Sequence, residues 1–127
     1  MIIIKQIITT TIIMLTLDGI WLGVIAKKLY VQEMGSLLSK NPNFIAAAIV
    51  YTLMVSGIII FVLPKAQNNP LMALCFGALF GFICYGIYDF TNLAVISNWT
   101  LLISIVDLVW GSILCGVTSY LVALLYK

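Results

Sequence analysis

FIAAAIVYTLMVSGIIIFVL, residues 44–63, contains no charged side chain and decides the fold class. About 20 helical residues, each rising about 1.5 Å, cross the roughly 30 Å of hydrocarbon in a bilayer. Lipid offers the backbone no hydrogen-bond partner, so a spanning segment must be an α-helix or a strand of a closed barrel. The run shows no alternation of apolar and polar residues, which argues against a barrel strand. It therefore predicts a transmembrane helix.

Three further apolar blocks flank this stretch, at about residues 6–26, 71–96 and 100–126. Of the 127 residues, 64% are hydrophobic and 8% are charged, whereas a soluble domain carries about 25% charged residues. A chain with so few charged residues cannot form a surface that faces water. Lipid must therefore surround the folded protein. We predict an all-α integral membrane four-helix bundle that forms a single domain over residues 1–127, with the lipid bilayer as its partner.

The breaks between the blocks contain signals for helix ends. Asn41-Pro42 and Asn69-Pro70 are each typical of an N-cap followed by proline in the first helical turn. Pro64 is expected to stop the second span, because proline removes a hydrogen bond from the helical ladder. The shortest break, Ser97-Asn98, predicts a tight hairpin between the third and fourth spans.

The longest link, between the first two spans, has an amphipathic pattern over residues 28–39. Its apolar residues recur at helical spacing: Leu29, Tyr30, Met34, Leu37 and Leu38. This pattern predicts a short interfacial helix on the membrane surface. The alternative is an ordinary helical connector that touches the bundle.

Lysine placement gives a weak preference for one orientation. With the N-terminus inside, Lys5, Lys65 and Lys127 are cytoplasmic, and the other three lysines lie outside. Basic residues in short loops favour the cytoplasmic side. We expect an integral protein of the bacterial cytoplasmic (inner) membrane with both termini in the cytoplasm.

Several chemistries have no support in the composition. The chain has no His and no Arg, and its lysines do not cluster, so histidine-based catalysis and nucleic-acid binding are not expected. No Gly-rich phosphate loop or nucleophile elbow is present. The three cysteines lie in apolar blocks without a CxxC pair, as inert buried thiols do. We predict no metal site, and the sequence names no cofactor.

Three of the four acidic residues, Asp18, Asp89 and Asp107, lie inside apolar blocks, whereas every lysine lies at a block end or in a link. An Asp near the centre of a spanning helix costs roughly 2.5 to 3.5 kcal/mol to insert. The embedded charges have one sign and no basic partner at their depth. Such a cost is seldom carried without a use, so the three acids mark a candidate site.

Polar and aromatic side chains surround each acid. In Asp18-Gly-Ile-Trp21 and Asp107-Leu-Val-Trp110 the indole follows the acid by three positions, so its N–H is expected to donate to the carboxyl group on the same helix. The order of the blocks brings all three acids toward one membrane face. Gly77 and Gly81 form a small-xxx-small step that admits a close helix. The candidate ligand-binding residues are Asp18, Trp21, Tyr85, Tyr88, Asp89, Asn92, Asp107 and Trp110.

The same motifs carry a family resemblance. DGIWLG (18–23), YGIYDFTNLA (85–94), and Trp99 followed by DLVWG (107–111) resemble the predicted membrane-protein family catalogued as domain of unknown function 2177. The resemblance spans nearly the whole chain. It implies a small multi-span membrane protein and no activity, cofactor or catalytic residue.

Three functions remain open on the sequence. In the first, the acids line a polar site that binds or moves a proton, cation or small polar ligand. In the second, the protein is a membrane enzyme whose carboxyls act on a lipid or other apolar substrate, by acid–base work or through a divalent ion. In the third, the chain is a structural or accessory subunit whose protonated acids join helices. Neither the small ligand nor homo-oligomer formation follows from the sequence.

Overall fold

The computed structural model describes residues 1–127, and all its regular secondary structure is helical. Four segments are long and apolar enough to span a membrane: Ile2–Ile25, Phe44–Ala66, Pro70–Val95 and Leu101–Leu125. The first joins α1 (Ile2–Ile20) to a π-helical turn (Trp21–Ile25), and the second joins α3 (Phe44–Gly57), a π-helical turn (Ile58–Val62) and α4 (Leu63–Ala66). The last two are α5 (Pro70–Val95) and α6 (Leu101–Leu125). The predicted all-α membrane bundle is confirmed.

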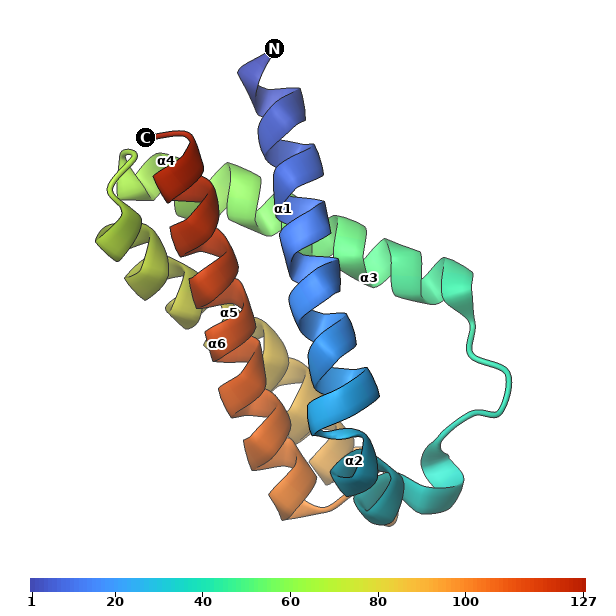
Figure 1. Cartoon of the computed structure of the whole chain (residues 1–127). Helices are drawn as coiled ribbons and strands as arrows, with labels where there is room; N and C mark the ends of the chain where they lie inside the picture. Colours follow the sequence, from blue (N-terminus) through green and yellow to red (C-terminus); the bar gives the residue numbers. More distant parts are fainter.

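Helices α5 and α6 form an antiparallel hairpin, and α1 lies beside α6 (Figure 1). The hairpin link is short, as predicted, and Asn98 takes a left-handed φ of 69° within it. Both termini lie at the end of the bundle opposite α2 (Lys27–Met34) (Figure 1). Helix α3 crosses α1, and its first half points away from the rest of the bundle (Figure 1).

Glycines set the close approach of α5 and α6. A Cβ at Gly77 would lie 2.6 Å from the carbonyl oxygen of Cys115, and one at Gly81 would overlap the carbonyl oxygen of Gly111. Both contacts are with backbone, which has no rotamer by which to move aside. The predicted small-xxx-small motif therefore allows a close helix–helix contact, and the partner helix is α6.

The second span is attached to the bundle mainly by its C-terminal half. Val55, Ile58 and Val62 are buried in a core cluster with Met14 of α1 and Leu114 of α6. By contrast, most side chains from Phe44 to Leu53 are exposed, which in a membrane means contact with lipid. The first half of α3 is thus a thinly packed arm that extends away from the rest of the bundle.

Of the two predicted Asn-Pro helix starts, one is confirmed. The Asn69 side chain accepts hydrogen bonds from the backbone N–H groups of Leu71 (3.0 Å) and Met72 (3.2 Å), and Pro70 opens α5. The predicted N-cap at Asn41 is wrong. Asn43 caps α3 by accepting from the backbone N–H of Ala46 at 3.1 Å, because it directly precedes the first residue of the helix.

Pro64 does not end the second span, contrary to prediction. The π-helical turn before it shifts the backbone pairing, so that the N–H of Leu63 bonds to the carbonyl of Ile58. Pro64 then falls in the first turn of α4, where a missing N–H is tolerated. The span ends only at Ala66, and Gln67 and Asn68 after it adopt left-handed φ angles of 52° and 61°.

A short helix separates the first two spans, as predicted, but it is shorter than residues 28–39. Helix α2 ends at Met34 and is followed by a 3-10 turn over Gly35–Leu37. Gly35 has a φ of 48°, a conformation that ends an α-helix and favours glycine. The location of α2 on the membrane surface stays a prediction.

The caps supply a matched test of these assignments. Asn69→Ala is expected to lower the unfolding free energy by about 1 kcal/mol, because two backbone N–H groups of α5 lose their acceptor. Asn41→Ala, the same change at the Asn-Pro pair that does not cap, should leave stability unchanged. Denaturant titration in detergent micelles, followed by far-UV circular dichroism, measures both. Equal losses for the two variants would contradict the assignment.

Candidate functional site

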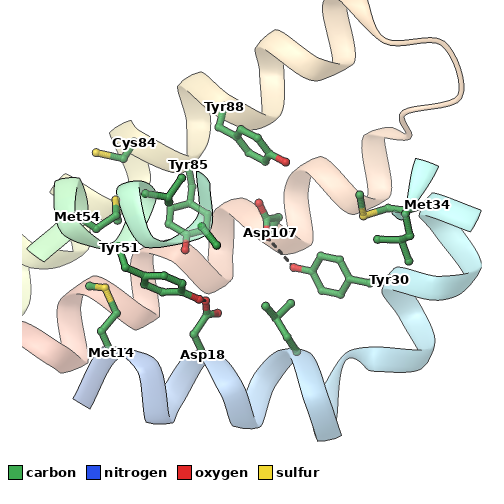
Figure 2. Close-up of a pocket in the computed structure, with 14 residues that line it drawn as sticks. Met14, Asp18, Tyr30, Met34, Tyr51, Met54, Cys84, Tyr85, Tyr88 and Asp107 are labelled. Carbon is green, nitrogen blue, oxygen red and sulfur yellow. Dashed lines mark hydrogen bonds between the residues drawn. The ribbon is translucent and has the colours of Figure 1, made fainter. Parts of the chain in front are cut away.

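The three embedded acids come from three different helices. Asp18 near the end of α1 is 5% exposed, Asp89 in the last third of α5 is fully buried, and Asp107 in the second turn of α6 is half-buried. Asp18 and Asp107 line one pocket (Figure 2). Asp89 lies outside that lining, and neither of its carboxyl oxygens has a hydrogen-bond partner.

Asp18 has a hydrogen-bond donor for each of its oxygens. The indole N–H of Trp110 on α6 donates to Oδ1 at 2.9 Å, and the hydroxyl of Tyr51 on α3 donates to Oδ2. Hydrogen bonds to a charged group are stronger than neutral ones. Asp18 thus joins α1 to both α3 and α6.

Asp107 is held by a two-step hydrogen-bond chain. The indole N–H of Trp21 lies 3.2 Å from the Tyr30 hydroxyl oxygen, and that hydroxyl lies 2.7 Å from Oδ1 of Asp107. An indole N–H only donates, so the Tyr30 oxygen accepts from it and the Tyr30 proton points to Asp107. Burial, the largest influence, raises the pKa of Tyr30 above its ordinary value of 10.0, although the Trp21 hydrogen bond acts in the opposite direction. Tyr30 therefore remains a donor at physiological pH.

The predicted pairing of each indole with the acid on its own helix was wrong. Trp110 donates to Asp18 on the neighbouring helix, and Trp21 reaches Asp107 through Tyr30. Helices α1 and α6 are antiparallel, so the Trp of one lies level with the Asp of the other. The two indoles stack between them, with centroids 4.6 Å apart and planes 8° from parallel. The two Asp-x-x-Trp motifs form one reciprocal unit.

Two members of the site were missed by sequence reasoning. The sequence pattern places Tyr30 on the apolar face of the interfacial helix, and Tyr51 is one of few hydroxyls in an uncharged span. A phenol in an apolar run needs a partner when buried, and this was the available signal. Nothing local in the sequence identifies an acid on another helix as that partner.

The other candidate residues differ in how they are placed. Tyr85 and Tyr88 line the pocket, and the ring of Tyr85 packs on Gly111 of α6. Tyr88 also contacts Trp99 edge to face, with centroids 5.9 Å apart. Asn92 is half-buried and outside the lining. Four of the eight candidates therefore line the pocket, namely Asp18, Tyr85, Tyr88 and Asp107. Trp110 and Trp21 are connected to the pocket by their hydrogen bonds to Asp18 and Tyr30.

The pocket has a volume of about 460 Å³ and lies between α1, α2, α3, α5 and α6. Its polar groups are two carboxyls and four phenols, and the rest of its lining is apolar. No lysine is among the lining residues, which are Met14, Asp18, Leu22, Tyr30, Met34, Leu38, Ala47, Val50, Tyr51, Met54, Cys84, Tyr85, Tyr88 and Asp107. Figure 2 shows the Tyr51 hydroxyl directed at the Asp18 carboxyl and the Tyr30 hydroxyl directed at the Asp107 carboxyl.

The size and lining of the pocket resemble those of sites that bind small molecules. No group of three or more His, Cys, Asp or Glu side chains is arranged to hold a metal ion. Apolar pockets of about 300 to 1,000 Å³ with a few convergent polar groups are typical sites for small molecules. Aromatic faces beside carboxylates also favour positive charge.

Comparison with known proteins gives a family and no activity. No curated protein and no solved structure matches the chain. The sequence profile of a family described as predicted membrane protein (DUF2177) matches residues 3–124, which include both Asp-x-x-Trp motifs and Asp89. With four apolar helices of spanning length and a match over nearly its whole length, the chain is an integral membrane protein that belongs to the DUF2177 family.

Proposed function

We propose that this protein binds a small organic cation inside the membrane, in the pocket whose negative charge comes from Asp18 and Asp107. One observation carries the proposal: two carboxyls share a pocket of about 460 Å³ that is otherwise apolar and aromatic and contains no basic side chain. A cationic ligand would supply the missing positive charge. Of the ligands considered from the sequence, an organic cation best matches a lining with this much apolar surface.

The hydrogen bonds around the acids support this choice. Asp18 accepts from Tyr51 and Trp110, and Asp107 accepts from Tyr30. These donors favour ionised carboxyls, and Coulomb attraction is stronger at a site with little water than in bulk solvent. The rings of the four lining tyrosines offer cation–π contacts worth about 0.5 to 2 kcal/mol each.

The location of the pocket in the cell is part of the proposal. Lysine placement favours the cytoplasmic membrane with both termini in the cytoplasm. Asp18 lies near the end of α1 and Asp107 near the start of α6, and these helix ends lie at the end of the bundle where α2 is found (Figure 1). In that orientation the pocket belongs to the outer half of the membrane, and a fluorescent fusion at the C-terminus tests the orientation.

Calorimetric titration of the protein in detergent tests the binding function. The probe is benzyltrimethylammonium, and its uncharged isostere is neopentylbenzene. We expect the cation to bind at least tenfold more tightly than the isostere. Asp18→Asn and Asp107→Asn are each expected to weaken cation binding about tenfold, a loss of about 1.4 kcal/mol, because each removes one of the pocket's negative charges.

Glu33→Gln is the matched control for charge removal. Glu33 lies outside the pocket lining and accepts from the Thr100 hydroxyl at 2.9 Å, so its variant should bind the cation as the wild type does. Equal affinity for the cation and its isostere would overturn the proposal, as would Asn variants that bind like the wild type. Turnover of an added phospholipid by the protein alone in detergent would favour a membrane enzyme instead.

A further inference from the structure

Asp89 is the one embedded acid whose carboxyl has no hydrogen-bond donor. Its side chain is fully buried, and neither Oδ1 nor Oδ2 has a hydrogen-bond partner. A buried carboxylate without a donor or a counter-ion is strongly unfavourable, because nothing replaces its lost hydration. Each pocket-facing acid has at least one donor, so the environment of Asp89 differs in kind from theirs.

The polar groups near Asp89 offer no proton to its carboxyl. The Ser104 hydroxyl on α6 points to backbone carbonyls, those of Thr100 (3.0 Å) and Asp89 itself (3.5 Å). The Tyr30 hydroxyl on α2 donates to Asp107. On its own helix, Tyr88 faces the pocket. Asp107 follows Ser104 by three residues on α6, so it lies one helical turn away on the same face, and its carboxyl group is the acidic neighbour of Asp89.

Protonation of Asp89 would remove the unfavourable buried charge. A neutral carboxyl has one O–H donor, and the adjacent Asp107 carboxyl is an acceptor. We propose that Asp89 and Asp107 form a proton-binding pair in which Asp89 carries the proton at neutral pH and donates it to the Asp107 carboxylate. Two neighbouring carboxyls at a site with little water share a proton, because ionising both places like charges side by side.

With Asp89 protonated, each of the two pocket-facing acids accepts two hydrogen bonds. Asp18 accepts from Tyr51 and Trp110, and Asp107 then accepts from Tyr30 and Asp89. The three acids carry two negative charges rather than three, and both charges face the pocket. Asp89 is a positioning residue in this arrangement, since it acts through Asp107 and does not line the pocket.

Infrared spectroscopy detects the proton without any ligand, so this test is independent of cation binding. Purified protein at neutral pH should show the C=O stretching band of a protonated carboxyl, and the band should shift in deuterated buffer. Asp89→Asn should abolish the band. Asp18→Asn and Glu33→Gln, which remove carboxyls outside the pair, should leave it in place.

A second measurement separates proton donation from a merely structural role. The amide of Asp89→Asn keeps an N–H donor for Asp107, so binding of benzyltrimethylammonium should stay within about threefold of wild type. Asp89→Leu has no donor and should weaken binding about tenfold, with the circular dichroism spectrum confirming that it folds. A spectrum of the wild type without a protonated-carboxyl band, or a band that survives Asp89→Asn, would overturn the proposal whether or not the cation binds.

Discussion

Gly81→Ala is expected to destabilise the protein by about 1 to 3 kcal/mol, the usual penalty for overpacking a close contact. An added Cβ would overlap the carbonyl oxygen of Gly111 and lie 2.9 Å from the Cβ of Cys115. The neighbouring backbone can yield only if α5 and α6 move apart. That movement would disturb the contact between Tyr85 and Gly111 one turn away, and with it one wall of the pocket.

Gly19→Ala is the matched control, because a Cβ there meets no atom within 4 Å. Alanine is the better helix former by about 1 kcal/mol, so this variant should be as stable as the wild type or slightly more so. Unfolding in mixed micelles of increasing dodecyl sulfate content, followed by tryptophan fluorescence, measures both variants. If Gly81→Ala and Gly19→Ala unfold at the same dodecyl sulfate content, the close α5–α6 contact is not present in the protein.

Tyr51→Phe is expected to lower the unfolding free energy by about 1.5 to 3 kcal/mol, the value of a hydrogen bond to a charged group. The change removes only the hydroxyl that donates to Asp18, and it leaves one oxygen of a buried carboxyl unpaired. It also frees the arm formed by the first half of α3, which has few other contacts with α1. The same micelle titration measures the loss.

Tyr120→Phe makes the same chemical change at a half-buried position of α6 outside the pocket lining, and should change stability by less than about 0.5 kcal/mol. Introducing Tyr51→Phe into an Asp18→Asn background completes a double-mutant cycle. The effect of Tyr51→Phe should shrink there, because the charged acceptor is already gone. An unchanged effect in that background would show that the Tyr51 hydroxyl does not act through Asp18.

Properties that depend on short stretches of chain were predictable. The four spans follow from uncharged runs such as residues 44–63, because transfer of a helix into lipid depends on the summed hydropathy of about 20 neighbouring residues. Asn69-Pro70 was recognised as a helix start for the same reason: a cap acts within one turn. The three acids also stood out locally, since each is a charge within an apolar run.

Short signals failed where the decisive neighbour lay elsewhere. Asn41-Pro42 looked like a cap, yet Asn43 supplies it, because either residue can cap and the start of the helix decides between them. Pro64 looked like a stop, yet a π-helical turn before it places the proline where its missing N–H is harmless. In both cases the motif is present, but it does not determine the backbone geometry of the residues around it.

The sequence by itself determined a membrane bundle with three embedded acids, whereas only the tertiary structure decided what those acids contact. Asp18 bonds to residues 33 and 92 positions away, and Asp107 to one 77 positions away. Such pairs depend on the antiparallel register of α1 and α6 and on the crossing of α3, which no local pattern specifies. In lipid, where an unpaired polar group is unfavourable, helix packing selects these partners, and with them the acids that face the pocket.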